Sequence, residues 1–251
     1  MRTMLLITSV LLSANASAAE RVVRETIPVN ADVRFSIDLH RAELEVTTGS
    51  VDAVELIAYI QHDDQEVLDE VEVHIEQSRS DVAVEVYYDD PDNQVDFDFI
   101  GLIDYEYPQI RFVIVVPDDA SLDVEAHRSQ LEIAAPAGRI DIDTSRTTGR
   151  ITNVRNDLDL VTARGDIDIE VLSLHDMDIE AQRSDIRLDI FGATDYTLAG
   201  DTQRGEVRVT GQEIATEERD RGMRVNHVSG SGSSFVSFDV ERGNIMLNFR
   251  N

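Results

Sequence analysis

The sequence repeats one short pattern of apolar residues around an arginine, and this repeat limits the folds that the chain can adopt. Apolar residues lie six and four positions before the arginine and three and five positions after it. The segments "LDVEAHRSQLEI" from Leu122, "LDLVTARGDIDI" from Leu158 and "MDIEAQRSDIRL" from Met177 are three copies. Because alternate residues of a β-strand face the same side, each copy predicts two short strands joined at the arginine.

The arginines recur at a nearly constant interval. Arg128, Arg146, Arg164, Arg183 and Arg204 are separated by 18, 18, 19 and 21 residues, and further copies centre on Arg41 and Arg242. One copy cannot bury its apolar face alone, so the copies must stack into a common core. We therefore expect an all-β, single-domain β-solenoid, β-helix-like, with 18–21-residue rungs about 4.8 Å apart.

We interpret the repeated arginine as a structural corner residue beside a turn. The following residue is expected to be small or to take an unusual φ. Acids two positions on offer partners for the guanidinium groups: Glu43, Asp166, Asp185 and Glu206. The functional alternative is an arginine stripe that binds an anionic glycan.

Parts of the chain depart from the repeat. Residues 20–120 are expected to form N-terminal strands and an irregular cap, in which "DDQEVLDEV" predicts one short helix and residues 87–108 form an acidic loop. Regular rungs are expected over residues 121–210. A loop excursion over residues 211–234 and a final rung over residues 235–251 complete the predicted domain.

The first 18 residues have the features of a secretory signal peptide. Arg2 precedes an apolar run, and small residues end at Ala18, where cleavage is expected. An uncleaved membrane anchor is the alternative, but the apolar run is far shorter than the ~20 residues that span a bilayer. No later stretch predicts a transmembrane segment. Residues 19–251 are therefore expected to be periplasmic or secreted.

Composition narrows the function. The net charge is −28, which opposes binding to nucleic acid or to an anionic lipid surface. All 22 basic residues are arginines, and the absence of lysine excludes a P-loop and a Schiff-base enzyme. The chain has no cysteine, so a hydrophobic core and not disulfides must stabilise it.

Two groups of acids are candidate calcium ligands, because calcium prefers several oxygen ligands. The first lies in the acidic loop and does not follow EF-hand spacing, and a solvated loop is the alternative. The second is a predicted outward column, in which stacked carboxylates could share a cation. The candidate ligands in the loop are Asp89, Asp90, Asp92, Asp96 and Asp98. The candidate ligands in the column are Asp123, Asp141, Asp159 and Asp178. No other cofactor is expected.

The segment "VIVVPDDASLDVEA" and the "RGDIDI", "RGEVRV" and "RGNIML" segments carry a family resemblance. They resemble the β-strand-repeat family labelled "putative adhesin", which is similar to the GIN-type head domain of autotransporter adhesins. The resemblance covers residues 27–249. It implies a β-strand-repeat fold and an adhesin-like role, and it supplies no catalytic residues. Ser129, Thr147 and Ser184 stand where the family usually has glycine.

These observations favour an exported, non-catalytic cell-envelope protein, an adhesin-like scaffold that binds a surface glycan or a protein partner. A calcium-binding or calcium-stabilised envelope protein is the alternative. A polysaccharide lyase or hydrolase is less favoured: glycosidases need two carboxylates in a cleft, and short rungs without long loops offer no cleft walls. The ligand and the oligomeric state are not predicted.

Overall fold

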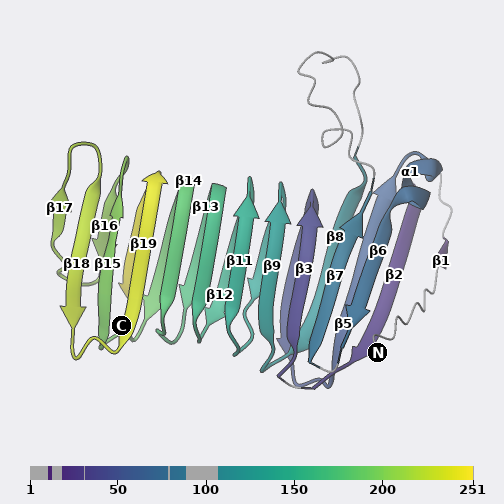
Figure 1. Cartoon of the computed structure of the whole chain (residues 1–251), viewed down its shortest axis with the longest axis horizontal. Helices are drawn as coiled ribbons and strands as arrows, with labels where there is room; N and C mark the ends of the chain where they lie inside the picture. The colour runs from purple at the N-terminus through teal and green to yellow at the C-terminus, as the bar shows by residue number, and fades with distance from the viewer. Residues whose placement is uncertain (1–10, 13–18, 31, 79, 89–106, 251) are drawn as a thin grey trace, which may run out of the picture.

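The computed structural model describes residues 11–12, 19–30, 32–78, 80–88 and 107–250. Within these ranges the chain is all-β apart from one short helix, and its strands form one continuous 20-stranded sheet. Figure 1 shows the strands side by side along the long axis of the molecule, in two layers. No helix in the described ranges has the length and apolar character needed to cross a bilayer.

The first layer contains the strands that precede the repeated arginines. Its strands pair in parallel from β7 to β15, whereas β6, β18 and β17 pair antiparallel. In spatial order they are β6 (Glu72–Gln77), β7 (Asp81–Tyr87), β3 (Arg34–His40), β9 (Ser121–His127), β11 (Ile140–Ser145), the first halves of β13 (Leu158–Val171) and β14 (Met177–Phe191), β19 (Ser234–Arg242), β15 (Tyr196–Thr202), β18 (Met223–Ser229) and β17 (Thr216–Glu218).

The second layer contains the strands that follow the arginines. Pairing is parallel from β8 to β16 and antiparallel among β1, β2, β5 and β8. In spatial order the strands are β1 (Leu11–Leu12), β2 (Ala19–Pro28), β5 (Ala53–His62), β8 (Gln109–Pro117), β4 (Ala42–Gly49), β10 (Gln130–Ala134), β12 (Thr148–Val154), the second halves of β13 and β14, β20 (Ile245–Arg250) and β16 (Val207–Thr210).

Neighbouring copies pair residue for residue. Asp141 of β11 lies opposite Asp123 on one side and Asp159 on the other, one repeat away in each direction. The all-β class predicted from the alternation is thus observed, with parallel pairing of the copies in the register of the repeat. The more detailed prediction of a solenoid built of 18–21-residue rungs stays a prediction.

The core lies between the two layers and consists of the apolar residues of the repeat. Leu122, Val124, Leu131 and Ile133 of one copy are all buried, with at most 2% of each residue exposed. Burying each such side chain contributes about 1.5–3 kcal/mol relative to leaving it in water. The alternating pattern therefore explains both the strands and their stacking.

The spatial order of the copies departs from their order in the chain at both ends. The last copy, β19 and β20, lies between β14 and the β15–β16 copy. The first copy, β3 and β4, likewise lies between β7–β8 and β9–β10. Gly200 of β15 makes room for the last copy, because a Cβ there would collide with the backbone and ring of Phe238.

The segments expected to be irregular contain regular structure. The predicted short helix is confirmed as α1 (Gln65–Glu70), which begins after Asp64, whose carboxylate accepts a hydrogen bond from the Glu66 amide. Residues 211–234, expected as a loop excursion, contain β17 and β18. These strands pair antiparallel onto β15 and cover its outer edge.

Candidate functional site

In six of the seven copies the turn at the repeated arginine is built in one of two ways. Arg41, Arg128 and Arg146 have φ angles of 52°, 53° and 57°, in the left-handed region. Where glycine follows the arginine, as at Gly165 (φ 130°) and Gly243 (φ 133°), the glycine has the positive φ instead. Left-handed backbone costs a non-glycine residue about 1–2 kcal/mol. The stacked turns must therefore compensate this cost in three copies.

Buried hydroxyl groups provide part of that compensation. Thr147, which follows Arg146, is fully buried, and its hydroxyl accepts a hydrogen bond from the Ser129 amide and lies 3.2 Å from the Ala126 carbonyl oxygen. The Ser129 hydroxyl in turn accepts from the Ala42 amide of the next copy. The small residue after the arginine was predicted, but this inter-copy network of hydroxyl groups was not. It satisfies backbone groups that the turns would otherwise leave buried and unpaired.

The repeated arginines lie in one line along the corner between the two layers. Arg183 pairs in register with Arg164 and with Arg242. Backbone hydrogen bonds join the other corners to their neighbours. At one end of the line the Arg41 amide donates to the His127 carbonyl, and at the other end the Gly243 amide donates to the Arg204 carbonyl. We call this line the arginine ridge; in spatial order it comprises Arg41, Arg128, Arg146, Arg164, Arg183, Arg242 and Arg204.

Most of the ridge faces solvent. Arg41 and Arg128 are half-buried, and the other five arginines are exposed. In the described part of the chain, the side chains of these five make no hydrogen bond or ion pair. Two of the four acids predicted as partners bind elsewhere: Asp185 accepts from the Asn244 backbone and side chain, and Glu206 pairs with Arg208.

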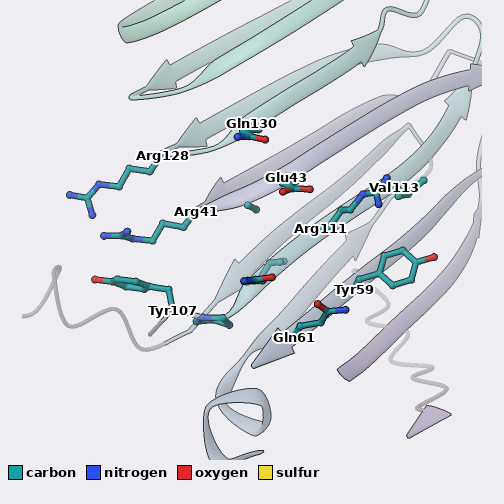
Figure 2. A pocket seen from close by; sticks show the side chains of 13 residues that line it. Arg41, Glu43, Tyr59, Gln61, Tyr107, Arg111, Val113, Arg128 and Gln130 are labelled. Atoms are coloured by element: carbon teal, nitrogen blue, oxygen red, sulfur yellow. The ribbon is translucent and has the colours of Figure 1, made fainter. Parts of the chain in front are cut away.

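A groove of about 600 Å³ begins at one end of the ridge. Arg41 and Arg128 line it, and Figure 2 shows their side chains side by side, pointing the same way, with Tyr107 below Arg41. The Arg41 guanidinium carbon lies 3.6 Å from the centre of the Tyr107 ring, a cation–π contact. Three glutamines lie along the rest of the groove: Gln61, Gln109 and Gln130.

A third arginine of the groove has a carboxylate partner. Arg111 of β8 donates to Glu45 of β4 at 2.8 Å, and this hydrogen bond raises the pKa of the Arg111 guanidinium. The pair holds the Arg111 side chain along the outer face of the sheet. The sequence could not reveal this groove, because β8 and β4 are distant in sequence and their pairing is not part of the repeat.

The predicted outward column of acids is observed on the outer face of the first layer. Asp123, Asp141, Asp159 and Asp178 are consecutive register partners. Polar groups on the same face contact all four. Arg34 pairs with Asp123, Arg139 with Asp141 (2.9 Å) and Asp159 (3.5 Å), and the Ser237 hydroxyl donates to Asp178 at 2.7 Å.

A second acidic column, which the sequence analysis missed, runs beside the first. Asp38 lies in register with Glu85 on one side and with Glu125 on the other, and Asp143 follows Glu125. Burial, and next the Glu85 charge, raises the pKa of Asp38. The charge of Asp38, followed by burial, raises the pKa of Glu125. Its members Glu125 and Asp143 each lie two residues after an acid of the first column, so the repeat could have predicted this column.

No group of three or more His, Asp or Glu side chains in the described ranges has a geometry that could hold a metal ion. The loop candidates, Asp89, Asp90, Asp92, Asp96 and Asp98, lie outside the described residues. Calcium binding therefore stays a prediction, both for the loop and for the first column.

No protein-family model and no curated protein matches this chain. Among solved structures, it is similar to a "putative cell adhesion protein" from Clostridium sporogenes, with 11% identity and a TM-score of 0.50 over 92% of this chain and 100% of that one. A "putative adhesin" from Bacteroides fragilis has 9% identity and a TM-score of 0.30 over 91% and 97%. A "putative adhesin" from Parabacteroides merdae has 9% identity and a TM-score of 0.29 over 94% of this chain and 98% of that one. The first likeness shows a shared fold.

Proposed function

We propose that this protein is an exported, non-catalytic cell-envelope protein, an adhesin-like β-solenoid that binds a surface glycan or a protein. The observation that carries the proposal is the register of the copies. Because equivalent residues of successive copies lie opposite one another, some outer positions become columns of like residues along the molecule, as at Asp123, Asp141, Asp159 and Asp178. Such columns provide long linear surfaces, which suit adhesion to an extended partner.

Two further observations support this proposal. The fold neighbour from Clostridium sporogenes is named a "putative cell adhesion protein", and the likeness covers the whole of that chain. In addition, β2 begins at Ala19, the residue that follows the proposed cleavage point. Cleavage after Ala18 would remove β1 and leave β2 whole. The proposed location is the periplasm or the extracellular space, and the GIN-type resemblance belongs to this proposal as well.

The direct test is co-sedimentation of the purified protein with cell-envelope fractions of the organism that produces it. We expect the protein to pellet with at least one fraction, whereas an unrelated acidic protein of similar size stays in the supernatant. Failure to pellet with every fraction would overturn the adhesin-like role. Sequencing the N-terminus of the exported protein tests the cleavage point, with Ala19 expected as the first residue.

The same experiment separates the alternatives. Binding that EDTA abolishes and calcium restores would favour the calcium-dependent alternative over a calcium-independent scaffold. Release of new reducing or unsaturated sugar ends from the envelope polysaccharide would support a hydrolase or a lyase instead. We expect pelleting to survive EDTA without release of sugar ends, because the first acidic column already has arginine and hydroxyl partners.

A further inference from the structure

We infer that the arginine ridge binds a linear acidic polysaccharide, with carboxylate or sulfate groups repeated along its chain and with the polymer lying along the ridge. This inference deepens the proposed function and rests on it. It assigns the ligand class and the surface, and it converts the seven corner arginines from structural residues alone into binding residues.

The first argument is the spacing of the charges. Consecutive ridge arginines belong to hydrogen-bonded neighbouring strands, so their backbones are about 4.8 Å apart, and six such steps extend over roughly 29 Å. A polymer with one acidic group on each sugar presents anions at a comparable interval. The ridge can therefore contact several consecutive sugars without bending the polymer.

The second argument is the state of the side chains. The five exposed ridge arginines form no ion pair within the described residues, although the chain has far more acids than arginines. On the outer face of the second layer, by contrast, charges of opposite sign lie next to one another. Along one register the outer residues alternate in sign: Glu132, Arg150, Asp168 and Arg187. An arginine fork binds carboxylates and sulfates through two parallel hydrogen bonds, and it stays charged at any physiological pH.

The net negative charge opposes the approach of any polyanion, so this binding depends on the local charges at the ridge. The two acidic columns lie on the outer face of the first layer, whereas the ridge lies at the corner. At physiological ionic strength the Debye length is about 8 Å, so charges beyond that distance are largely screened. The residues that immediately precede the ridge arginines on the first-layer side are mostly neutral: His40, His127, Ser145, Ala163, Gln182, Glu241 and Gln203.

A polysaccharide fits these features better than a nucleic acid. Single-strand binding proteins use rows of aromatic side chains on which the bases stack. Along the middle of the ridge the neighbouring residues are Ser145, Ala163 and Gln182, which offer no such platform.

The groove lies at one end of the arginine ridge. Arg41 and Arg128 are the first two residues of the ridge and also line the groove, so a polymer that follows the ridge leads into it. Tyr107 holds the Arg41 guanidinium from below, and Gln130 and Gln109 offer amide donors and acceptors suited to sugar hydroxyl groups. Figure 2 shows the side chains of Arg128, Arg41 and Tyr107 one below another.

The test is titration of the protein with polygalacturonate and with dextran sulfate, and with neutral dextran and an oligothymidylate strand as comparisons. The ridge variant is R164Q/R183Q/R242Q, whose three arginines are consecutive, exposed and free of positive φ. The control variant is R150Q/R187Q/R208Q, which removes the same charge from the outer face of the second layer. Thermal unfolding of both variants establishes that they fold.

We expect the parent protein to bind at least one acidic polymer in a salt-sensitive manner and not to bind dextran. The ridge variant should bind about ten-fold more weakly or worse, which corresponds to a modest contribution from each exposed contact, and the control should bind like the parent. Equal weakening in both variants, binding to neither acidic polymer, or preference for oligothymidylate would overturn the inference. Pelleting with envelope fractions in the absence of acidic-polymer binding would overturn the ridge inference and leave the proposed function standing.

Discussion

The backbone at Gly165 lies against the carbonyl of Thr147 so closely that a Cβ on the glycine would overlap the carbonyl oxygen. These two residues occupy equivalent places in neighbouring copies. Thr147 can carry a side chain because Arg146 takes the positive φ, whereas in the next copy Gly165 itself takes it. Two different turns are therefore stacked directly on one another at the corner.

Gly165→Ala should destabilise the protein by roughly 2–4 kcal/mol, because it adds both strained backbone and an overlap with Thr147. Gly192→Ala is the matched control: Gly192 has φ 63°, but its Cβ position meets no atom within 4 Å. That change should cost only about 1–2 kcal/mol. Urea unfolding of both variants checks the difference, and equal losses would show that the close approach at the corner has no energetic weight.

Thr147→Val should cost about 1–3 kcal/mol, because the buried Ser129 amide loses its acceptor while the volume of the side chain is kept. The neighbouring Thr148 is exposed, and Thr148→Val provides the control with the same chemical change. Chemical denaturation of the two variants measures the effect. A Thr147→Val variant as stable as the parent would mean that the hydroxyl network is dispensable.

The sequence predicted the parts of the fold that depend on local periodicity. Alternation around the arginines identified the paired strands, and the 18-residue interval correctly placed Asp123, Asp141 and Asp159 opposite one another. The insertion of β19 and β20 between β14 and β15 could not be predicted. The apolar pattern of the last copy fits several neighbours equally well, and only the small Gly200 beside Phe238 marks the actual one.

The candidate site was predicted in the same uneven way. The seven arginines and the small residues after them follow from the repeat. The left-handed backbone at Arg41, Arg128 and Arg146 does not, because alanine, serine or threonine after an arginine does not indicate a positive φ at the arginine. The groove depends on β8 pairing with β4 and β5, strands outside the repeat. Contacts between segments distant in sequence leave no periodic signal.

The second acidic column should make the free energy of unfolding increase as the pH falls from 7 into the acidic range. The pKa of Asp38 is raised in the folded protein above its ordinary value of 3.8 by burial and by Glu85. The folded state therefore binds this proton more tightly than the unfolded chain. The resulting stabilisation is fully present below pH 3.8 and is lost as the pH rises through the raised value.

Asp38→Asn should consequently raise the urea midpoint at pH 7, and the gain should vanish below pH 3.8, where the parent carboxyl is protonated. It should also lower the pKa of Glu125, since the Asp38 charge is the main cause of that raised value. Asp119→Asn, in an exposed turn, makes the same change in charge away from the column. A pH-independent gain, or the same gain in both variants, would contradict this explanation.

Phe238→Ala tests the inserted position of the last copy. Phe238 is buried beside Gly200 and pairs with Ile179 of β14 on its other side, so its loss leaves a cavity between three copies. We expect a loss of about 3–5 kcal/mol, as for other buried phenylalanines. Phe235 of the same strand is 47% exposed, so Phe235→Ala should cost far less. If the last copy instead stacked at the end of the molecule, Phe238 would contact one neighbour only. The two substitutions would then differ little in their urea midpoints.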